Sequence, residues 1–374
     1  MAYFSKRGKG WQARIPWTDS NGKRHSKNKG GFATKALAKK WATQNEALLN
    51  KGVAIDKSIS LADYFDHWYQ TYKEPKVAQP TLNRYKINAD VIRDHFGNQL
   101  IDKITRSQYQ AFLNDYGSDH APKTVKKLNS CIRACVKSAI LDDYLIKDFT
   151  QGVVAIGDES KMLKVEYLNV DEIKQLITAA KSKLDWRYPS RFMIITAIYT
   201  GMRKEEIQAL TWQDVDFIHH TISVNKAWRE LKNDGESVQH FNNHRFKKTK
   251  TESSNRKIKV NQDLLDCLMI LRKHSNSNLV FRSEFGTIPT SNALNAKLRG
   301  LLVDLKLERT NFHFHSLRHS HVALLLAEGI DIYAISKRLG HSDISVTMNT
   351  YAYLIDEYKQ ETDQKIVEAL DKLA

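Results

Sequence analysis

The stretch TGMRKEEIQAL, residues 200–210, decides how the rest of the sequence is interpreted. It follows a strongly apolar segment, residues 191–199, and Gly201 predicts the end of the helix formed by that segment. Arg203 comes next, and its planar guanidinium matches two oxygens of a phosphate group. Glu206 lies one helical turn later, so we expect its carboxylate to hold this guanidinium in place. The stretch therefore predicts an anion-binding site at a helix end.

Three further stretches follow in the chain: HSLRH at residues 315–319, LGHS at residues 339–342 and NTY at residues 349–351. Together with residues 200–210, and in this order, they resemble the signature boxes of the tyrosine recombinases, the phage and transposon integrase family. The motifs that carry the resemblance span about residues 200–351. The resemblance implies a site-specific DNA recombinase that integrates and excises a mobile element such as a prophage or a conjugative transposon.

The resemblance implies six catalytic residues and a supporting role for Glu206. The two arginines suit the nonbridging oxygens of a phosphate, and the two histidines add hydrogen-bond donors to the same group. The tyrosine is the nucleophile, and it needs cations nearby because a free phenol has a pKa of about 10. A lysine serves as the general acid for the leaving oxygen. The six residues are Arg203, Lys250, His315, Arg318, His341 and the nucleophile Tyr351.

Two of these assignments keep a rival. Residues 221–260 hold ten basic and four acidic residues, and a lysine-rich hairpin there can deliver a proton to the leaving 5′ oxygen. The stretch KTESSNR resembles the family's K-T-x-S-S-x-R pattern and favours Lys250, with Lys248 as the alternative. The spacing from His341 to Tyr351 is similar to that of the family, and this resemblance favours Tyr351 as nucleophile. Tyr353 stands where relatives often carry histidine and is the second candidate.

The implied reaction needs no external energy source. Attack by the tyrosine leaves a 3′-phosphotyrosyl bond and a free 5′ hydroxyl, so neither ATP, another cofactor nor a metal ion is expected. The resemblance implies double-stranded DNA attachment sites as the substrate, a homotetramer on DNA, and accessory DNA-bending or excision factors as partners. A final helix over about residues 356–373 is expected to pack either on a neighbouring subunit or on its own domain.

The charge of the chain points to the same partner. Lys and Arg outnumber Asp and Glu by 58 to 42, and a formal net charge of +16 attracts polyanions. The first fifty residues hold eleven basic residues and two acidic ones, a segregation that favours a DNA-binding module over a solvated surface of mixed charge. The predicted DNA contacts are Lys6, Arg7, Arg14, Lys23 and Arg24 in this module and Lys123, Lys126 and Lys127 further along; for the latter three a solvated helix face is an equal alternative.

Patterns along the chain predict a multidomain, mainly α-helical protein with small β-sheets. We expect an arm-type DNA-binding domain at residues 1–55, made of a small sheet and one helix. A helical core-binding domain is expected at residues 56–155, and a mostly helical tyrosine-recombinase catalytic domain at residues 165–374. The weakly patterned segment 151–164 is the expected linker.

In the first domain, alternating apolar and polar residues predict a strand at residues 11–17, followed by an Asn21-Gly22 hairpin turn. Pro16 favours an edge position for this strand. Thr34 is the expected N-cap of the helix that follows. The apolar face of that helix is expected to carry Leu37, Trp41 and Leu48.

In the second domain, residues 60–63 have the form of a capping box. The helical stripes after it are interpreted as core rather than as a stacking platform for bases: Tyr64, Phe65, Trp68 and Tyr72; then Leu82, Tyr85, Ala89 and Ile92; then Val125, Leu128, Ile132, Cys135 and Val136. In the third domain, short strands are predicted at residues 215–217, 221–224 and 258–260.

Composition also bears on other classes of protein and on the cellular compartment. The longest apolar run is too short to cross a bilayer, and three cysteines without a CxxC pair fit a reducing compartment. We therefore expect a protein of the bacterial host cytoplasm or nucleoid, without a membrane partner. The first rival is a metal-dependent nuclease, because four histidines lie within nine residues, at positions 313, 315, 319 and 321. A noncatalytic DNA-binding protein and a type IB topoisomerase are the others.

Overall fold

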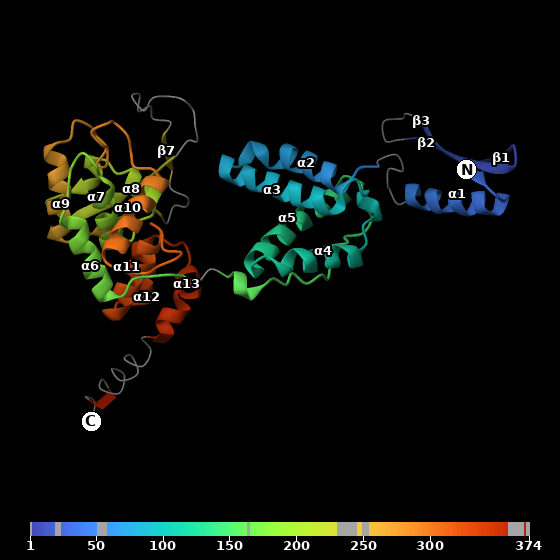
Figure 1. The fold of residues 1–374 in the computed structure, drawn as a ribbon. Helices are drawn as coiled ribbons and strands as arrows, with labels where there is room; N and C mark the ends of the chain where they lie inside the picture. The colour runs from blue at the N-terminus through green and yellow to red at the C-terminus, as the bar shows by residue number, and fades with distance from the viewer. Residues whose placement is uncertain are drawn as a thin grey trace. The chain divides into compact units, whose positions relative to one another are not determined.

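The structure is a computed structural model that describes residues 2–18, 24–50, 58–162, 165–229, 245–248, 254–357 and 370–371. Within these ranges, the side chains of residues 48–50, 248 and 353–357 are not described. The chain divides into two compact units, Met1–Met162 and Leu163–Ala374, and each is treated by itself. The ribbon in Figure 1 labels the elements of both.

The first unit opens with a small antiparallel sheet packed on one helix. Strands β1 (Tyr3–Arg7), β2 (Gly10–Thr18) and β3 (Arg24–Phe32) lie in that order, and α1 (Lys35–Asn50) covers one face. The buried core between sheet and helix consists of Ala13, Ile15, Ala38 and Ala42. The predicted strand and the sheet-plus-helix arrangement are confirmed, whereas the predicted turn at residues 21–22 lies outside the described residues.

Two expectations for this module are wrong. The strand with Pro16 is central rather than at an edge, because β2 pairs with both neighbours. Pairing with β1 ends at Arg14 opposite Tyr3, so Pro16 faces only β3 and its missing amide hydrogen interrupts no bond to β1. Leu37 is 50% exposed, since the inward face of α1 is made by smaller residues. Leu48 falls among the side chains outside the description.

Thr34 caps α1 as predicted. The amide of Leu37 donates to Thr34 Oγ1 at 3.2 Å, and the amide of Ala38 donates to the Thr34 carbonyl at 3.3 Å. These bonds satisfy amides at the helix start that have no partner within the helix.

The rest of the first unit is a helical bundle. Its helices are α2 (Leu61–Tyr72), α3 (Gln79–Phe96), α4 (Arg106–Ser118) and α5 (Pro122–Leu141), with short 3₁₀ turns at Glu74–Lys76 and Ile101–Lys103. The three predicted stripes form its core, with the exceptions of Tyr72 and Tyr85. Tyr85 is partly buried. Tyr72 is 45% exposed because it occupies the last turn of α2, where its hydroxyl reaches toward Asp142. Ser60 caps α2 by accepting the amide of Asp63 at 3.0 Å.

The predicted linker segment packs on this bundle over part of its length. Val153 and Ala155 lie against the helical core, and a 3₁₀ turn at Glu159–Lys161 follows. Gly157 approaches the backbone so closely that a Cβ there would come within 2.6 Å of the His120 carbonyl oxygen. Glycine is therefore required for this contact.

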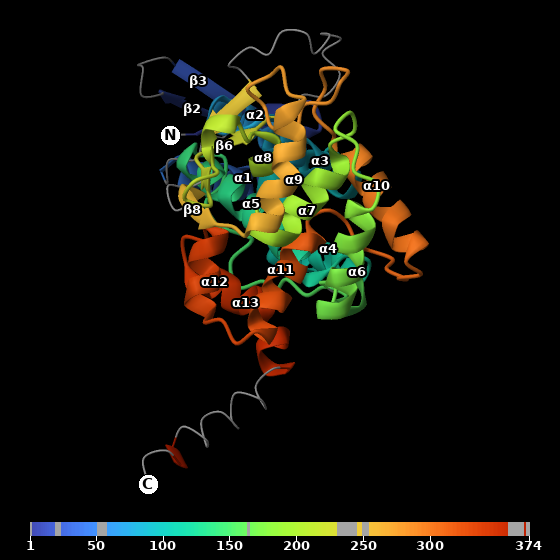
Figure 2. The ribbon, with the colours of Figure 1, turned by 90° about the vertical axis from the view of Figure 1, so that its left-hand side faces the viewer.

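The second unit is mostly helical and is built around α7 (Ser190–Thr200), whose side chains are nearly all buried. Helices α6 (Val170–Lys181), α9 (Gln262–Lys273), α10 (Ser291–Asp304) and α11 (Ser316–Ala327) pack on it, as Figure 2 shows from a second side. The short α8 (Lys204–Gln208) follows α7 directly. Helices α12 (Ile332–Leu339) and α13 (Ile344–Glu357), red in Figures 1 and 2, pack against each other and against α11.

Two small sheets complete this unit. After a 3₁₀ turn at Trp212–Asp214, β4 (Val215–Asp216), β5 (Thr221–Val224) and β8 (Arg256–Lys259) form an antiparallel sheet. Strands β6 (Lys226–Trp228) and β7 (Phe246–Lys248) form a separate pair. The three predicted strands are thus confirmed within a residue or two. The predicted final helix, residues 356–373, lies largely outside the described residues, and no described helix is long and apolar enough to span a bilayer.

Candidate active site

The C-terminal end of α7 forms one wall of the site. Gly201 adopts a left-handed conformation, with φ +64°, and ends the helix as predicted. A Cβ on this residue would lie 2.6 Å from Cδ2 of His321 and 3.0 Å from a methyl carbon of Leu339. The glycine thus allows α7 to end directly against α11 and α12, which carry residues of two of the three later boxes.

Arg203 and Glu206 interact as predicted at the start of α8. Arg203 Nη1 donates to Glu206 Oε1 at 2.9 Å, and the Arg203 backbone amide donates to Oε2 at 3.0 Å. The side chain of Arg203 remains 32% exposed, whereas that of Glu206 is 3% exposed. The buried carboxylate therefore holds the guanidinium at the edge of the site while leaving other N–H donors of Arg203 accessible.

Glu206 also binds a second arginine, Arg256 of β8. Arg256 Nη2 donates to Glu206 Oε2 at 2.8 Å, and its Nε donates to the Arg338 carbonyl at 2.7 Å. Burial acts to raise the pKa of Glu206, but the hydrogen bonds and charges of Arg256 and Arg203 outweigh it and hold this pKa below its usual value. Glu206 is therefore ionised at neutral pH and joins two segments of the chain.

Arg318 lies deep in the site, 3% exposed. Its Nη1 donates to the Gly201 carbonyl at 2.6 Å, and its Nη2 donates to the Leu339 carbonyl and to His341 Nε2, both at 2.9 Å. Burial and the charge of Arg203 lower its pKa to about 9. Three of the five N–H donors of this guanidinium are used within the protein, and the ends of α7 and α12 fix its orientation.

The hydrogen bonds of His341 define its protonation. Nε2 receives a hydrogen bond from the Arg318 guanidinium, so it carries no proton, and Nδ1 must then donate to Thr347 Oγ1 at 2.7 Å. Burial and the charges of Arg318 and Arg203 lower the pKa of His341 to about 4. The imidazole is neutral at pH 7 and connects α12 to α13.

Tyr351 is buried, 1% exposed, in a cluster with Val322, Ala323, Ile335 and Leu339. Its backbone departs from helical geometry, with φ −118° and ψ 16°, so α13 is kinked at this residue. The hydroxyl lies 2.9 Å from Nδ1 of His319, and the two ring centroids are 5.5 Å apart. The negative charge of a Tyr351 phenolate would act to raise the pKa of Arg318.

His315 is the N-cap residue of α11 and is exposed. Its ring centroid is 5.2 Å from that of His319. The protein around its ring and the charge of Arg318 lower its pKa below the usual value for histidine. The ring of His319 therefore contacts both the ring of His315 and that of Tyr351.

The four histidines that suggested a metal site have different surroundings. Nδ1 of His321 donates to the Ile198 carbonyl at 2.7 Å, and its Nε2 accepts from Arg338 Nε at 3.1 Å. His313 contacts the Asn311 carbonyl and the hydroxyl of Ser316. Within the described ranges, no three His, Cys, Asp or Glu side chains come together as ligands for a metal ion.

Lys250 lies outside the described residues, and Lys248 is described only as backbone in β7. The hairpin of β6 and β7 is held by Lys226 of β6, which pairs with Lys248 across the strands and forms an ion pair with the buried Asp214. Burial acts to raise the pKa of Asp214, but the hydrogen bonds from Lys226 and Thr211 hold it below its usual value. This pair anchors the hairpin to the body of the unit.

The predicted DNA contacts are exposed wherever they are described. These residues are Lys6, Arg7, Arg14 and Arg24 on the small sheet and Lys123, Lys126 and Lys127 on α5; Lys23 lies outside the described residues. Each of them is accessible to a phosphate.

Sequence reasoning missed the roles of two residues. Arg256 and His319 both lie inside stretches that resemble the family's boxes, KTESSNR and HSLRH, but neither was selected as a site residue. The available signal was their position: Arg256 ends its stretch, and His319 comes one residue after Arg318. Only the packing of β8 and α13 identifies their partners.

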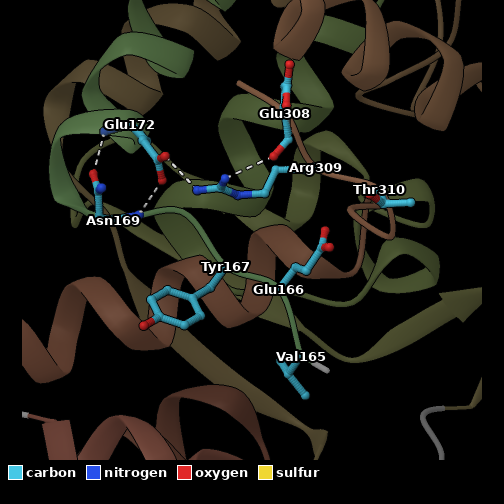
Figure 3. Close-up of a pocket in the computed structure, with 8 residues that line it drawn as sticks. All are labelled: Val165, Glu166, Tyr167, Asn169, Glu172, Glu308, Arg309 and Thr310. Carbon is cyan, nitrogen blue, oxygen red and sulfur yellow. Dashed lines mark hydrogen bonds and ion pairs between the residues drawn. The ribbon is translucent and has the colours of Figure 1, made fainter. Parts of the chain in front are cut away.

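A separate concave region lies beside the start of α6 (Figure 3). There Arg309 Nη2 donates to Glu172 Oε1 at 2.6 Å, and Tyr167 packs against the cluster that contains Tyr351. The pocket has a volume of about 500 Å³ and is lined by Val165, Glu166, Tyr167, Asn169, Glu172, Glu308, Arg309 and Thr310. None of these is a predicted site residue.

Three stretches of the chain match known protein families. Residues 1–47 match an arm DNA-binding domain, residues 60–117 match the N-terminal SAM-like domain of phage integrases, and residues 166–357 match the phage integrase family. The last match covers more than half of the chain.

Curated relatives resemble the chain over most of its length. It is 24% identical to an integrase of Staphylococcus phage L54a, with 86% of this chain and 96% of the relative covered. It is 27% identical to the ICEBs1 integrase of Bacillus subtilis, with 77% of each covered.

Solved structures share the fold. The Tn1549 transposon integrase in complex with transposon right end DNA is 19% identical with a TM-score of 0.67, and 82% of this chain and 99% of that one are covered. A lambda integrase tetramer bound to a Holliday junction is 17% identical with a TM-score of 0.60, and 91% and 95% are covered.

Proposed function

The chain belongs to the phage integrase family and is a tyrosine-type site-specific recombinase, and on that premise we propose that Tyr351 cuts one DNA strand and holds it for rejoining. The phenolic oxygen attacks the scissile phosphorus, the bond to the 5′ oxygen breaks, and a 3′-phosphotyrosyl link forms. Attack by another 5′ hydroxyl on this link releases the tyrosine. Each exchange keeps the number of phosphodiester-type bonds constant, so the reaction is reversible.

The positive residues stabilise the pentavalent transition state in this proposal. Arg203 and Arg318 donate to the nonbridging oxygens, because guanidinium groups bind such oxygens in pairs. His315 adds a donor, His341 adds one only after its Nε2 releases Arg318 and takes a proton, and Glu206 positions Arg203. Lys250, with Lys248 as the alternative, protonates the leaving 5′ oxygen. No residue in this scheme requires ATP or a metal ion.

One observation carries the proposal: the HSLRH stretch contacts residues from every other box. Arg318 bonds to the Gly201 carbonyl and to His341, and Nδ1 of His319 lies 2.9 Å from the hydroxyl of Tyr351. Residues separated by more than a hundred positions thus share one pocket. This convergence supports a shared reaction centre over unrelated structural roles.

We further propose that the substrate is double-stranded DNA with specific attachment sites, bound by a homotetramer. The relative solved as a tetramer on a Holliday junction has the same fold. The arm module at residues 1–55 and the helical domain at residues 56–155 would bind DNA beside the catalytic domain, residues 165–374. The basic, exposed residues of the small sheet and of α5 support this division.

Trapping on a nicked suicide substrate tests the nucleophile. Wild-type protein is expected to form a covalent adduct with DNA, since the broken strand cannot be rejoined, and Tyr351→Phe is expected to form none. Tyr353→Phe is the matched control and should retain adduct formation. An active Tyr351→Phe, or an inactive Tyr353→Phe beside it, would overturn the assignment.

The same assay separates the rival functions. Adduct formation in EDTA excludes a metal-dependent nuclease, and adduct formation of any kind excludes a purely DNA-binding role. Recombination between two attachment-site duplexes distinguishes a recombinase from a topoisomerase, which would relax supercoils without exchanging partners.

A further inference from the structure

The hydroxyl of Tyr351 has a histidine neighbour with no assigned role in the scheme above. Nδ1 of His319 lies 2.9 Å from this oxygen, within the range over which a general base abstracts a proton. The contact is formed between α11 and α13, in the cluster where Tyr351 is 1% exposed. Water is thus largely kept from the phenol while His319 contacts it.

The other histidines of the site are less suited to take this proton. His341 Nε2 already accepts from Arg318, and its Nδ1 donates to Thr347, so it would have to give up the arginine first. His315 contacts the ring of His319, with ring centroids 5.2 Å apart, and makes no described hydrogen bond to Tyr351. His319 is the described histidine in hydrogen-bond contact with the nucleophile.

We propose that His319 is a further catalytic residue, the general base that accepts the phenolic proton of Tyr351 during strand cleavage. This inference rests on the proposed function, in which Tyr351 is the nucleophile. As the phenolic oxygen bonds to phosphorus, its O–H bond breaks and the proton moves to Nδ1 of His319, in the tautomer with hydrogen on Nε2. In the rejoining step the departing phenolic oxygen takes the same proton back, so protons balance over the cycle.

The electrostatics of the site leave His319 a weak base in the free protein, and bound DNA changes them. Burial and the neighbours His315, Arg318 and His313 lower the pKa of His319 to about 3, so the free protein holds it neutral and able to accept. A phosphate placed against Arg318 brings a negative charge that opposes the effect of the guanidinium. The proton affinity of His319 therefore rises when the scissile phosphate arrives.

Single-turnover adduct formation on the suicide substrate, with saturating full-length protein, tests the proposal. His319→Ala is expected to slow the reaction by about 100-fold or more, the usual contribution of a general base. His319→Asn keeps a hydrogen-bond acceptor near the Nδ1 position but takes no proton, so it should remain slow. Added imidazole should partly restore His319→Ala. His219→Ala, at an exposed histidine bonded to Asp216, is the matched control and should react like wild type.

A substrate with sulfur in place of the bridging 5′ oxygen separates this role from that of the general acid. Its thiolate leaves without protonation, because a thiol has a pKa of about 8.5. The His319→Ala defect should persist on this substrate. Recovery on the sulfur substrate would mean that His319 serves the leaving group and would overturn the proposal.

The remaining outcomes are also decisive. Full activity of the His319→Asn variant would mean that His319 only positions Tyr351. Unchanged or faster cleavage by His319→Ala would mean that the contact only restrains Tyr351 in the free protein. Either result would overturn the proposal that His319 is the general base. Equal DNA binding and equal melting temperatures identify folded variants. If Tyr351→Phe still forms the adduct, the proposed function fails instead.

Discussion

Glu206 and Arg256 lie 50 positions apart and form an ion pair through two hydrogen bonds, 2.8 Å between Nη2 and Oε2 and 3.3 Å between Nη1 and Oε1. The same carboxylate receives the side chain and the amide of Arg203. A single buried acid therefore orients one arginine at the edge of the site and attaches β8 to the start of α8. Replacing one member of such a buried pair lowers the stability of the protein, because the other charge is left without a counter-charge.

Glu206→Gln is expected to destabilise the second unit by about 3 kcal/mol, because Arg256 would lose its counter-charge in a buried position. Adduct formation should also slow as Arg203 loses its support. Differential scanning calorimetry of the full chain and the suicide-substrate assay measure the two effects. Glu205→Gln, at a partly exposed neighbouring position, is the control and should change stability by less than about 0.5 kcal/mol. Equal behaviour of the two variants would contradict the bridging role.

Arg318→Lys is expected to reduce adduct formation by about 100-fold or more, the scale of losing a preorganised donor to a developing oxyanion. One ammonium group cannot reach the Gly201 carbonyl, the Leu339 carbonyl and His341 together in the geometry of the guanidinium. Arg187→Lys, at an exposed pair with Asp185, should leave the rate unchanged. A fully active Arg318→Lys variant would contradict a catalytic role for this arginine.

Gly201→Ala is expected to lower stability by more than about 1 kcal/mol, since φ +64° is unfavourable with a Cβ and the new atom would press on His321. Gly300→Ala makes the matched comparison. Gly300 lies within α10, and a Cβ there meets no atom within 4 Å, so its replacement should stabilise by about 0.5–1 kcal/mol. Shifts of the same sign in thermal unfolding would refute the account of the α7 terminus.

Mild acid is expected to destabilise the second unit because of His321. Burial and the charge of Arg338 lower its folded pKa to about 3, whereas the unfolded chain binds a proton near pH 6.5. Its contribution is therefore complete above pH 6.5 and is lost as the pH falls from there toward 3, by up to about 1.4 kcal/mol per unit. Melting temperatures between pH 7 and pH 5 measure this before carboxylates titrate. A constant melting temperature in that window would contradict it.

Arg14→Gln is expected to weaken DNA binding at all sequences and to reduce the slope of log K against log salt by about 1. Arg14 alternates with the buried Ala13 and Ile15, so it projects from the sheet face opposite α1. Lys40→Gln, on α1, is the control of equal charge change and should have a smaller effect. Salt titrations by fluorescence anisotropy with the full chain measure both. Identical slopes would mean that this sheet face does not bind phosphates.

Local patterns predicted much of the fold because they depend on neighbours in sequence. The stripe from Val125 to Val136 is buried with 3.6-residue periodicity, and Thr34 and Ser60 cap their helices. Predictions from local patterns failed where the outcome depended on a packing partner that is distant in sequence. Leu37 is exposed because Ala38 and Ala42 meet the sheet, and the strand with Pro16 can be central because β1 pairs with it only as far as Arg14.

By itself, the sequence determined the family, the order of the domains and the boxes that hold the proposed site, since spacing and residue type carry that information. Tertiary structure alone decided which side chains touch. The residues near Arg318 in sequence do not indicate that its guanidinium donates to the carbonyls of Gly201 and Leu339. They also do not indicate that His319 contacts the hydroxyl of Tyr351. Those contacts arise because α7, α11, α12 and α13 bury their apolar faces together, and packing over long sequence separations sets their relative positions.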